Sequence, residues 1–217
     1  MTSRISWDRM LTEMPLIAIL RGIAPPEVLA VAAILKQAGF LCLEVPLNSP
    51  DPLASIRRLR DHFGGQLAIG AGTIVSEAQV AAVQHAGAEF VVSPHASPSV
   101  IRATKARGLA SLPGVATATE AFAAVEAGAD ALKLFPAEAA PPRVLQALKS
   151  VLPSSVPVFP VGGITPGVMK GYVDAGAAGF GIGSALYKPG LDFGAVCDRA
   201  IAFVDAWHEL RKPAANP

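Results

Sequence analysis

A short pattern of helix end, glycine and apolar residue recurs along the chain and constrains the fold more than any other feature of the sequence. It occurs at residues 37–40, 85–88, 126–129 and 174–177, each time with Ala-Gly at its centre. Glycine tolerates the left-handed conformation in which many helices end, and an apolar segment follows each copy directly. Such internal repetition is expected of a chain built from stacked βα units.

Apolar segments alternate with segments typical of helices along the whole chain. The predicted strands cover residues 16–20, 41–45, 67–73, 89–94, 110–114, 131–137, 156–161 and 179–183. The predicted helices cover residues 3–13, 25–39, 55–62, 76–86, 98–107, 117–127, 142–152, 165–175 and 191–209. Eight strands, each followed by a helix, predict a parallel (β/α)8 TIM barrel with an extra N-terminal helix. An open doubly wound sheet is the alternative, but no Gly-x-Gly-x-x-Gly motif follows the first strand.

The composition limits the class of protein. A chain of this length suits one domain over residues 1–217, with residues 211–217 as a loose tail. Because 52% of the residues are hydrophobic and only 16% are charged, a large core is expected. The net charge of +1 gives no support for a nucleic-acid or membrane-surface partner. Two cysteines, no long apolar run and a start without signal-peptide features together predict a cytoplasmic protein.

Lys133 lies in the middle of an apolar strand. At the strand period of two, Ala131 and Phe135 share its face, whereas Leu132 and Leu134 lie on the other. Burial disfavours the ammonium form, so the pKa of Lys133 should fall and its amine should become nucleophilic. A free amine in such a place suits Schiff-base chemistry with a carbonyl substrate. A lysine that snorkels to solvent or forms a salt bridge is the alternative for this residue taken alone.

Further candidates come at the carboxyl ends of the predicted strands, where the active sites of such barrels lie. Glu44 shares a strand face with Cys42 and can point inward. Beside Lys133 it is either half of a structural ion pair or a catalytic acid and base. Thr73 either donates its hydroxyl to a substrate carboxylate or caps the next helix. The candidates at these strand ends are Arg21, Glu44, Asn48, Thr73, Pro94, Lys133, Phe135, Gly162, Gly163 and Ser184.

Two glycine-rich turns end the last two predicted strands. Gly162 and Gly163 follow one strand, and residues 181–184 end the next. Backbone N–H groups of glycine can approach an anion closely, and helix amino termini favour negative charge. In barrels of this class the same two loops commonly hold a phosphate group. The sequence therefore predicts an anion site here, with simple tight turns as the alternative.

Seven short segments of the chain resemble the class I 2-keto-3-deoxy-6-phosphogluconate aldolase family. They are Ile19-Leu-Arg-Gly22, Glu44-Val-Pro-Leu-Asn-Ser-Pro50, Ile69-Gly-Ala-Gly-Thr73, Val92-Ser-Pro-His95, Leu112-Pro-Gly114, Lys133-Leu-Phe-Pro136 and Val161-Gly-Gly163. The resemblance extends over nearly the whole chain. It implies a homotrimer of (β/α)8 barrels that cleaves a phosphorylated keto sugar acid to pyruvate and glyceraldehyde 3-phosphate. No group of His, Cys and Asp has metal-ligand spacing, so neither a metal nor a cofactor is expected.

The resemblance also implies roles at the positions that match. Lys133 would form the Schiff base, and Glu44 would act as the general acid and base. The residues that would hold the pyruvate-derived carboxylate or line its pocket are Arg21, Thr73, Pro94 and Phe135. The residues that would bind the phosphate are Gly162, Gly163 and Ser184.

A few positions depart from the gluconate branch and are similar to the 2-keto-3-deoxy-6-phosphogalactonate aldolase branch. Asn48 and Ser49 stand where the gluconate branch usually has arginine and threonine, and Val161 stands where it usually has threonine. The two substrates are epimers at C4, and valine lacks a hydroxyl to bond one epimer, a difference worth about 1–3 kcal/mol. The galactonate substrate is therefore expected. The alternatives are the gluconate substrate, activity on both epimers, another class of phosphate-binding enzyme, or a barrel that binds sugar-acid phosphates without turnover.

Overall fold

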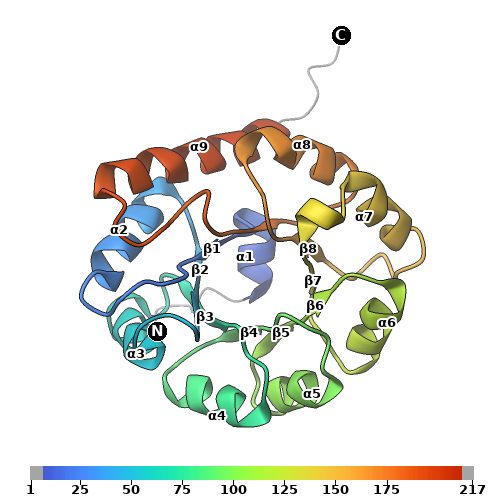
Figure 1. Ribbon diagram of the computed structural model, residues 1–217, viewed down its shortest axis with the longest axis horizontal. Helices are drawn as coiled ribbons and strands as arrows, with labels where there is room; N and C mark the ends of the chain where they lie inside the picture. The colour runs from blue at the N-terminus through green and yellow to red at the C-terminus, as the bar shows by residue number, and fades with distance from the viewer. Residues whose placement is uncertain (1–6, 212–217) are drawn as a thin grey trace.

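A curled parallel sheet forms the centre of the molecule, and helices surround it (Figure 1). The computed structural model describes residues 7–211. Its strands are β1 (Leu16–Ile19), β2 (Cys42–Pro46), β3 (Ala68–Gly72), β4 (Phe90–Val92), β5 (Ala110–Leu112), β6 (Gly114–Val115), β7 (Leu132–Leu134), β8 (Val158–Pro160) and β9 (Phe180–Ile182). Its helices are α1 (Trp7–Glu13), α2 (Val28–Ala38), α3 (Pro52–Phe63), α4 (Glu77–His85), α5 (Pro98–Ala106), α6 (Ala118–Glu126), the short 3-10 helix η1 (Ala137–Ala139), α7 (Pro142–Lys149), α8 (Pro166–Asp174) and α9 (Phe193–Arg211). Within this range, no helix is both long and apolar enough to cross a membrane.

Backbone hydrogen bonds arrange the strands in two sheets that follow one another around the centre. One sheet has the order β5-β4-β3-β2-β1-β9, and the other has the order β6-β7-β8. Only Pro113 separates β5 from β6 along the chain. At the second junction, a parallel bridge joins Val161, directly after β8, to Gly181 in β9. The strands therefore form a curled, TIM-barrel-like arrangement.

The predicted alternation of strands and helices is confirmed, although several element ends are shifted and η1, which includes Ala137 of a predicted strand, was not expected. Two further differences concern single residues. The segment predicted as one strand at residues 110–114 is two strands, because Pro113 has no N–H to donate to a ladder. Helix α9 includes Arg211, which the sequence-based prediction placed in the loose tail. Residues 3–6 of the first predicted helix and residues 212–217 of the predicted tail lie outside the described range.

The recurring glycines end helices as predicted. Gly39, Gly87, Gly128 and Gly176 have φ angles of 112°, 95°, 99° and 95°, all in the left-handed region. A side chain would be strained there, whereas glycine is not. Each turn returns the chain from the outer helical layer to the sheet, which explains why Ala-Gly recurs at the four helix ends.

The two faces of the strands lie in different apolar layers. Ala131 lies in the inner layer, enclosed by the sheet, together with Phe159. Leu132 and Leu134 lie in the outer layer, between the sheet and the helices. The predicted division of β7 into two faces is therefore confirmed. Cys42 also belongs to the inner layer, so Glu44, two residues further along β2, points the same way.

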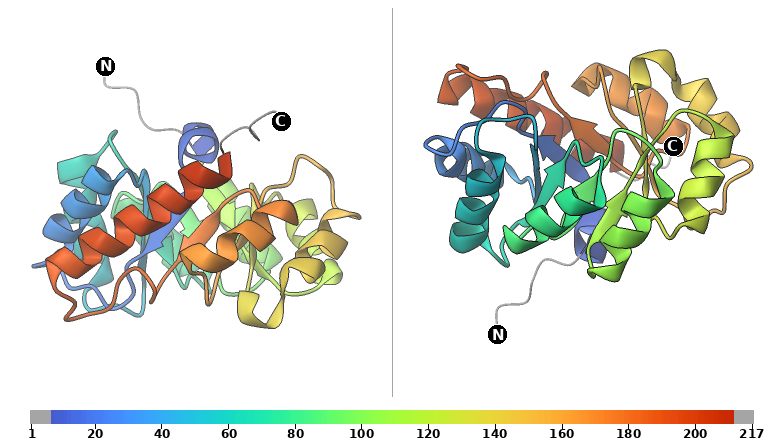
Figure 2. Two further views of the ribbon diagram at one scale, coloured as in Figure 1. Left: turned by 90° about the horizontal axis from the view of Figure 1, so that it is seen from above. Right: turned by 60° about the horizontal axis from the view of Figure 1, so that its bottom comes forward.

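Helix α1 packs against the inner layer at one end of the curled sheet (Figure 2). Met10 is fully buried. The ring of Trp7 lies 5.9 Å from that of Phe90 and 6.3 Å from that of Phe159, measured between centroids. This contact covers the apolar interior at the amino-terminal ends of the strands, which leaves the carboxyl-terminal ends available for a site.

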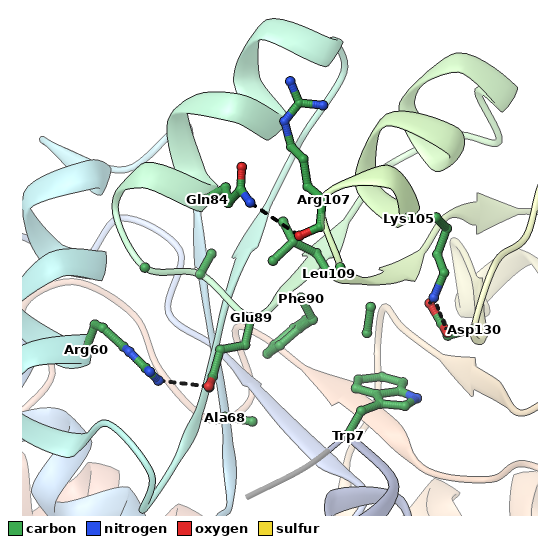
Figure 3. A pocket seen from close by; sticks show the side chains of 14 residues that line it. Trp7, Arg60, Ala68, Gln84, Glu89, Phe90, Lys105, Arg107, Leu109 and Asp130 are labelled. Atoms are coloured by element: carbon green, nitrogen blue, oxygen red, sulfur yellow. Dashed lines mark hydrogen bonds and ion pairs between the residues drawn. The ribbon is translucent and has the colours of Figure 1, made fainter. Parts of the chain in front are cut away.

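A cavity of about 600 Å³ lies beside Trp7 at the amino-terminal ends of β3, β4 and β5, and we call it the basal cavity (Figure 3). Four of the five charged side chains in its lining form two ion pairs. Arg60 Nη1 lies 2.8 Å from Glu89 Oε1. Lys105 Nζ lies 2.5 Å from Asp130 Oδ1. In each pair the base comes from the last turn of a helix and the acid from just before a later strand, so the pairs hold helix ends to the sheet.

Asp130 is expected to stabilise the fold mainly through a backbone hydrogen bond. The N–H of Ser111 donates to Asp130 Oδ2 at 2.8 Å, in addition to the ion pair with Lys105. Asp130→Ala should lower the free energy of unfolding by about 1–3 kcal/mol, because this N–H loses its acceptor. The matched variant Lys105→Met removes only a partly exposed ion pair and should cost less than about 1 kcal/mol. Urea unfolding followed by circular dichroism measures both, and equal losses would contradict the role given to the N–H.

Candidate active site

Lys133 and Glu44 come from strands that are not neighbours, yet both point into the interior of the curled sheet. Lys133 in β7 is 6% exposed, and Glu44 in β2 is 2% exposed. Their charges lie close enough for each to shift the pKa of the other. The structure thus brings together the two groups that the sequence suggested as a pair.

Burial lowers the pKa of Lys133, because an ammonium ion loses its hydration inside the protein. The Glu44 carboxylate opposes this shift, and the Arg21 guanidinium adds to it. The Lys133 Nζ also lies 4.5 Å from the ring centroid of Phe135, a contact that favours the cation. The net direction is a lowered pKa. More of this amine is therefore in the nucleophilic free-base form than in an exposed lysine.

Burial also raises the pKa of the Glu44 carboxyl group, while the positive charges of Lys133 and Arg21 hold it down. A carboxyl group with a raised pKa near an amine with a lowered pKa is suited to proton transfer, because both shifts narrow the difference between the two pKa values.

Gly72 leaves the space that the Glu44 carboxylate occupies. A Cβ added at Gly72 would collide with Glu44 Oε1 and come within 2.6 Å of its Cδ. Glu44 and Gly72 lie on neighbouring, paired strands. The glycine is thus required by the side chain next to it and not by a turn.

Gly72→Ala is expected to displace the Glu44 carboxylate, because neither strand can move without breaking its ladder. The free energy of unfolding should fall by about 1–3 kcal/mol from overpacking, and turnover should fall as well. The matched variant is Gly167→Ala, since a Cβ there meets no atom within 4 Å. Thermal unfolding and the turnover of the substrate proposed below check both variants. Full activity in Gly72→Ala would show that the position of Glu44 does not matter.

Asn48 and Ser49 accept hydrogen bonds that hold the loop carrying Arg21 in place. Arg21 Nη1 donates to Asn48 Oδ1 at 2.8 Å, and the N–H of Gly22 donates to Ser49 Oγ at 2.9 Å. Gly22 has a φ of 83°, and a Cβ there would come within 2.6 Å of Pro189 Cγ. The loop after β1 is therefore held between the loop after β2 and the loop after β9.

The glycine turn after β8 borders a cavity at the carboxyl ends of the strands. Gly162 and Gly163 have φ angles of 108° and 63°, and glycine adopts both without strain. The cavity has a volume of about 820 Å³, and we call it the active-site cavity. The predicted site residues in its lining are Arg21, Lys133, Phe135, Val161, Gly162, Gly163 and Ser184. The active-site cavity thus contains both Lys133 and the predicted anion site.

Thr73, Pro94, Glu44 and Asn48 are placed differently from these residues. They follow or belong to β2, β3 and β4, whereas the active-site cavity lies over β7, β8, β9 and β1. The charge of Glu44 shifts the pKa of Lys133, and the side-chain oxygen of Asn48 accepts a hydrogen bond from Arg21. Thr73 has a φ of 59°, a strained value for threonine, and such strain is frequent at functional sites. Within residues 7–211, no hydrogen bond or ion pair links Thr73 or Pro94 to Lys133, so their role stays a prediction.

Several residues of the active-site cavity were missed by the sequence analysis. Those with polar side chains are Glu138, Thr165 and Tyr187. Glu138 follows the strand of Lys133, and Tyr187 follows Ser184, so their position after barrel strands was an available signal. Tyr187 Oη donates to Glu27 Oε1 at 3.0 Å, which ties the loop after β9 to the start of α2.

Among the described residues, no group of three or more His, Cys, Asp and Glu side chains is placed to hold a metal ion. The groups that line the active-site cavity include an amine, a guanidinium and a glycine turn, and the Glu44 carboxyl group is near enough to shift the pKa of that amine. Together they can attack a carbonyl carbon, move protons and hold two anionic groups.

Comparison with known proteins agrees with this geometry. A family model described as KDPG and KHG aldolase matches residues 7–194. The chain is 48% identical over 198 residues to the 2-dehydro-3-deoxy-6-phosphogalactonate aldolase of Escherichia coli (strain K12), which covers 91% of this chain and 97% of the relative. It is 44% identical over 195 residues to a probable 2-dehydro-3-deoxy-6-phosphogalactonate aldolase of Rhizobium meliloti (strain 1021), which covers 90% and 92%. A solved structure described as native KDPGal matches with a TM-score of 0.90 at 47% identity, covering 92% of this chain and 97% of that one.

Proposed function

Because the chain belongs to the KDPG and KHG aldolase family, we propose that it cleaves 2-dehydro-3-deoxy-6-phosphogalactonate to pyruvate and glyceraldehyde 3-phosphate. The observation that carries this proposal is the buried Lys133, which has a lowered pKa, faces Glu44, and shares a cavity with a glycine turn. The relatives named above as phosphogalactonate aldolases support the choice of substrate.

The reaction would begin with a Schiff base. The free amine of Lys133 attacks the C2 ketone of the substrate and forms a carbinolamine. Loss of water, with Glu44 moving the protons through bound water, leaves an iminium ion between Nζ and C2. The positive iminium nitrogen can accept an electron pair, which a ketone does far less readily.

Cleavage of the C3–C4 bond would follow. Glu44 accepts the proton of the C4 hydroxyl, the C3–C4 electron pair moves toward the iminium nitrogen, and glyceraldehyde 3-phosphate leaves as an aldehyde. Glu44 or water then protonates the enamine at C3. Hydrolysis of the new iminium ion releases pyruvate and returns the free amine.

The remaining site residues would hold the ends of the substrate. Arg21 and Thr73 would bind the carboxylate, with Pro94 and Phe135 lining its pocket. The phosphate-binding residues of this proposal are Gly162, Gly163 and Ser184. Asn48 would act through Arg21, because its side-chain oxygen already accepts a hydrogen bond from that guanidinium.

Val161 would select between the C4 epimers. It lines the active-site cavity, belongs to the inner apolar layer and is 7% exposed. A valine offers an apolar surface where threonine would offer a hydroxyl, so a hydroxyl pointing toward it gains no partner.

Val161→Thr is expected to shift the ratio of kcat/KM toward the gluconate epimer by about 1–3 kcal/mol, on the order of ten- to a hundredfold. Retro-aldol rates on the two purified C4 epimers, measured as released pyruvate, test both the substrate and this residue. Val173→Thr, on the partly buried face of α8, is the control and should leave the ratio unchanged. A preference of the parent enzyme for the gluconate epimer would overturn the proposed substrate but not the aldolase reaction.

A barrel that binds sugar-acid phosphates without turnover is the second candidate. Trapping with borohydride in the presence of pyruvate separates the two, because only a Schiff base is reduced to a stable adduct. An enzyme of another phosphate-binding class would also use the glycine turn without labelling Lys133.

We also propose the complete architecture that the sequence predicts. It comprises one domain over residues 1–217, with a closed (β/α)8 barrel and α1 as an extra N-terminal helix. The strand order, the interruption at Pro113 alone and the Val161–Gly181 bridge support closure. A cytoplasmic homotrimer without nucleic-acid or membrane partners is proposed from the sequence and the family. Light scattering of the purified protein tests the trimer.

A further inference from the structure

Glu138 lies over the glycine turn after β8. A Cβ added at Gly163 would come within 2.6 Å of Glu138 Cγ and 3.1 Å of Oε1. A Cβ added at Gly162 would collide with Oε2 and come within 3.1 Å of Cδ. The carboxylate thus rests on both glycines and lines the active-site cavity with them.

The backbone beneath Glu138 is held in place. The N–H of Ala137 donates to the carbonyl of Val161 at 2.9 Å. The Tyr172 hydroxyl donates to the carbonyls of Ala137 and Ala140, at 2.8 Å and 3.2 Å. These bonds fix η1 on both sides of Glu138, and therefore fix the distance from its Cα to the turn.

The side chain of Glu138 is less restrained than its backbone. It is exposed, and none of the hydrogen bonds or ion pairs found within residues 7–211 involves its carboxylate. Rotation about its side-chain bonds therefore costs little, because no bond has to break. The carboxylate can cover the turn in one rotamer and leave it in another.

Charge makes the position of this carboxylate important. The bases in the lining of the active-site cavity are Arg21, Lys133 and Lys188, and Glu138 is the acid there. The proposed phosphate group would sit against Gly162 and Gly163, beside this acid. Two negative groups a few ångströms apart repel each other even in partly solvated surroundings. This repulsion should weaken phosphate binding by roughly tenfold in the dissociation constant.

We propose that Glu138 is a tethered anion that competes with the substrate's phosphate group for the Gly162–Gly163 turn. This inference rests on the proposed function, since it takes the turn to be the phosphate site. In the free protein the carboxylate covers the turn, and it has to swing away before phosphate binds. Glu138 therefore weakens phosphate binding and speeds the departure of the phosphorylated aldehyde, without contributing to the chemistry at Lys133.

Glu138→Gln tests the proposal, because glutamine keeps the shape of the side chain and removes its charge. Calorimetric titration with inorganic phosphate should show about three- to tenfold tighter binding than in the parent protein. KM for the phosphorylated substrate should fall, while borohydride trapping of pyruvate at Lys133 stays the same. Glu77→Gln, an exposed acid in the first turn of α4, is the control and should change neither.

The outcomes separate the competition at the glycine turn from the proposed Schiff-base function. Unchanged or weaker phosphate binding in Glu138→Gln would overturn the competition, and weaker binding would mean that the carboxylate helps to hold the ligand. Failure of every variant, including the parent protein, to bind phosphate would overturn the anion site and this inference with it. The pyruvate adduct reports on the proposed Schiff-base function independently in each case.

Discussion

Replacing Lys133 by methionine is expected to abolish pyruvate release and the adduct trapped by borohydride. Methionine has nearly the length of lysine and suits a buried position, so the fold should be retained or become more stable. The variant lacks the amine that would attack the substrate ketone, and no other step of the proposed reaction can proceed without the iminium ion. Mass spectrometry of the protein after reduction with pyruvate measures the adduct, and a coupled assay measures turnover.

Lys188→Met is the matched control for this experiment. Lys188 also lines the active-site cavity, but it is exposed and follows the last strand. This variant should keep the adduct even if its KM for the phosphorylated substrate rises. An adduct that persists in Lys133→Met would show that another lysine forms the Schiff base.

Replacing Glu44 by glutamine is expected to slow turnover by about 10²–10⁴-fold, because glutamine cannot transfer the protons of the carbinolamine or of the C4 hydroxyl. The adduct with pyruvate should still form, more slowly, since the amine remains. Single-turnover measurements with the phosphorylated substrate separate adduct formation from cleavage. Glu126→Gln, at the exposed end of α6, is the control and should have the parent rate. A near-normal rate in Glu44→Gln would remove Glu44 from the mechanism.

The same variant has a predicted effect on the pH dependence. In the parent protein the Glu44 carboxylate raises the pKa of Lys133 against the stronger lowering effect of burial. Without that negative charge, the pKa of Lys133 should fall further. Adduct formation needs the free amine and increases as the pH rises through this pKa. In Glu44→Gln the increase should therefore come at lower pH, and a shift to higher pH would contradict the assigned interaction.

Local patterns made much of the fold predictable. The glycines at 39, 87, 128 and 176 predicted helix ends, because only glycine is unstrained at positive φ. The period of two in β7 correctly separated the inward Lys133 from the outward Leu132 and Leu134, because successive side chains on a strand must point to opposite faces. The break at Pro113 was missed, although its missing N–H was visible in the sequence.

The sequence predicted where some candidate residues lie in the fold, because active sites of barrels gather at the carboxyl ends of strands. Lys133, Gly162 and Gly163 were predicted from such positions, and they line one cavity. Glu138 follows the same rule but carries no motif, so nothing set it apart from an ordinary surface acid. Asn48 was predicted to bind the substrate, and nothing in the sequence indicated that its side-chain oxygen accepts a hydrogen bond from Arg21.

The sequence by itself determined which elements form, which face each side chain takes and which loops are rich in glycine, because these depend on neighbours a few residues away. Only the tertiary structure decided that Glu44 lies near enough to Lys133 to shift its pKa, that Asn48 accepts a hydrogen bond from Arg21 and that Glu138 covers the glycine turn. Each of these interactions joins loops or strands separated by many residues. Their distances depend on how the sheet curls and how its strands are staggered, which no local periodicity specifies.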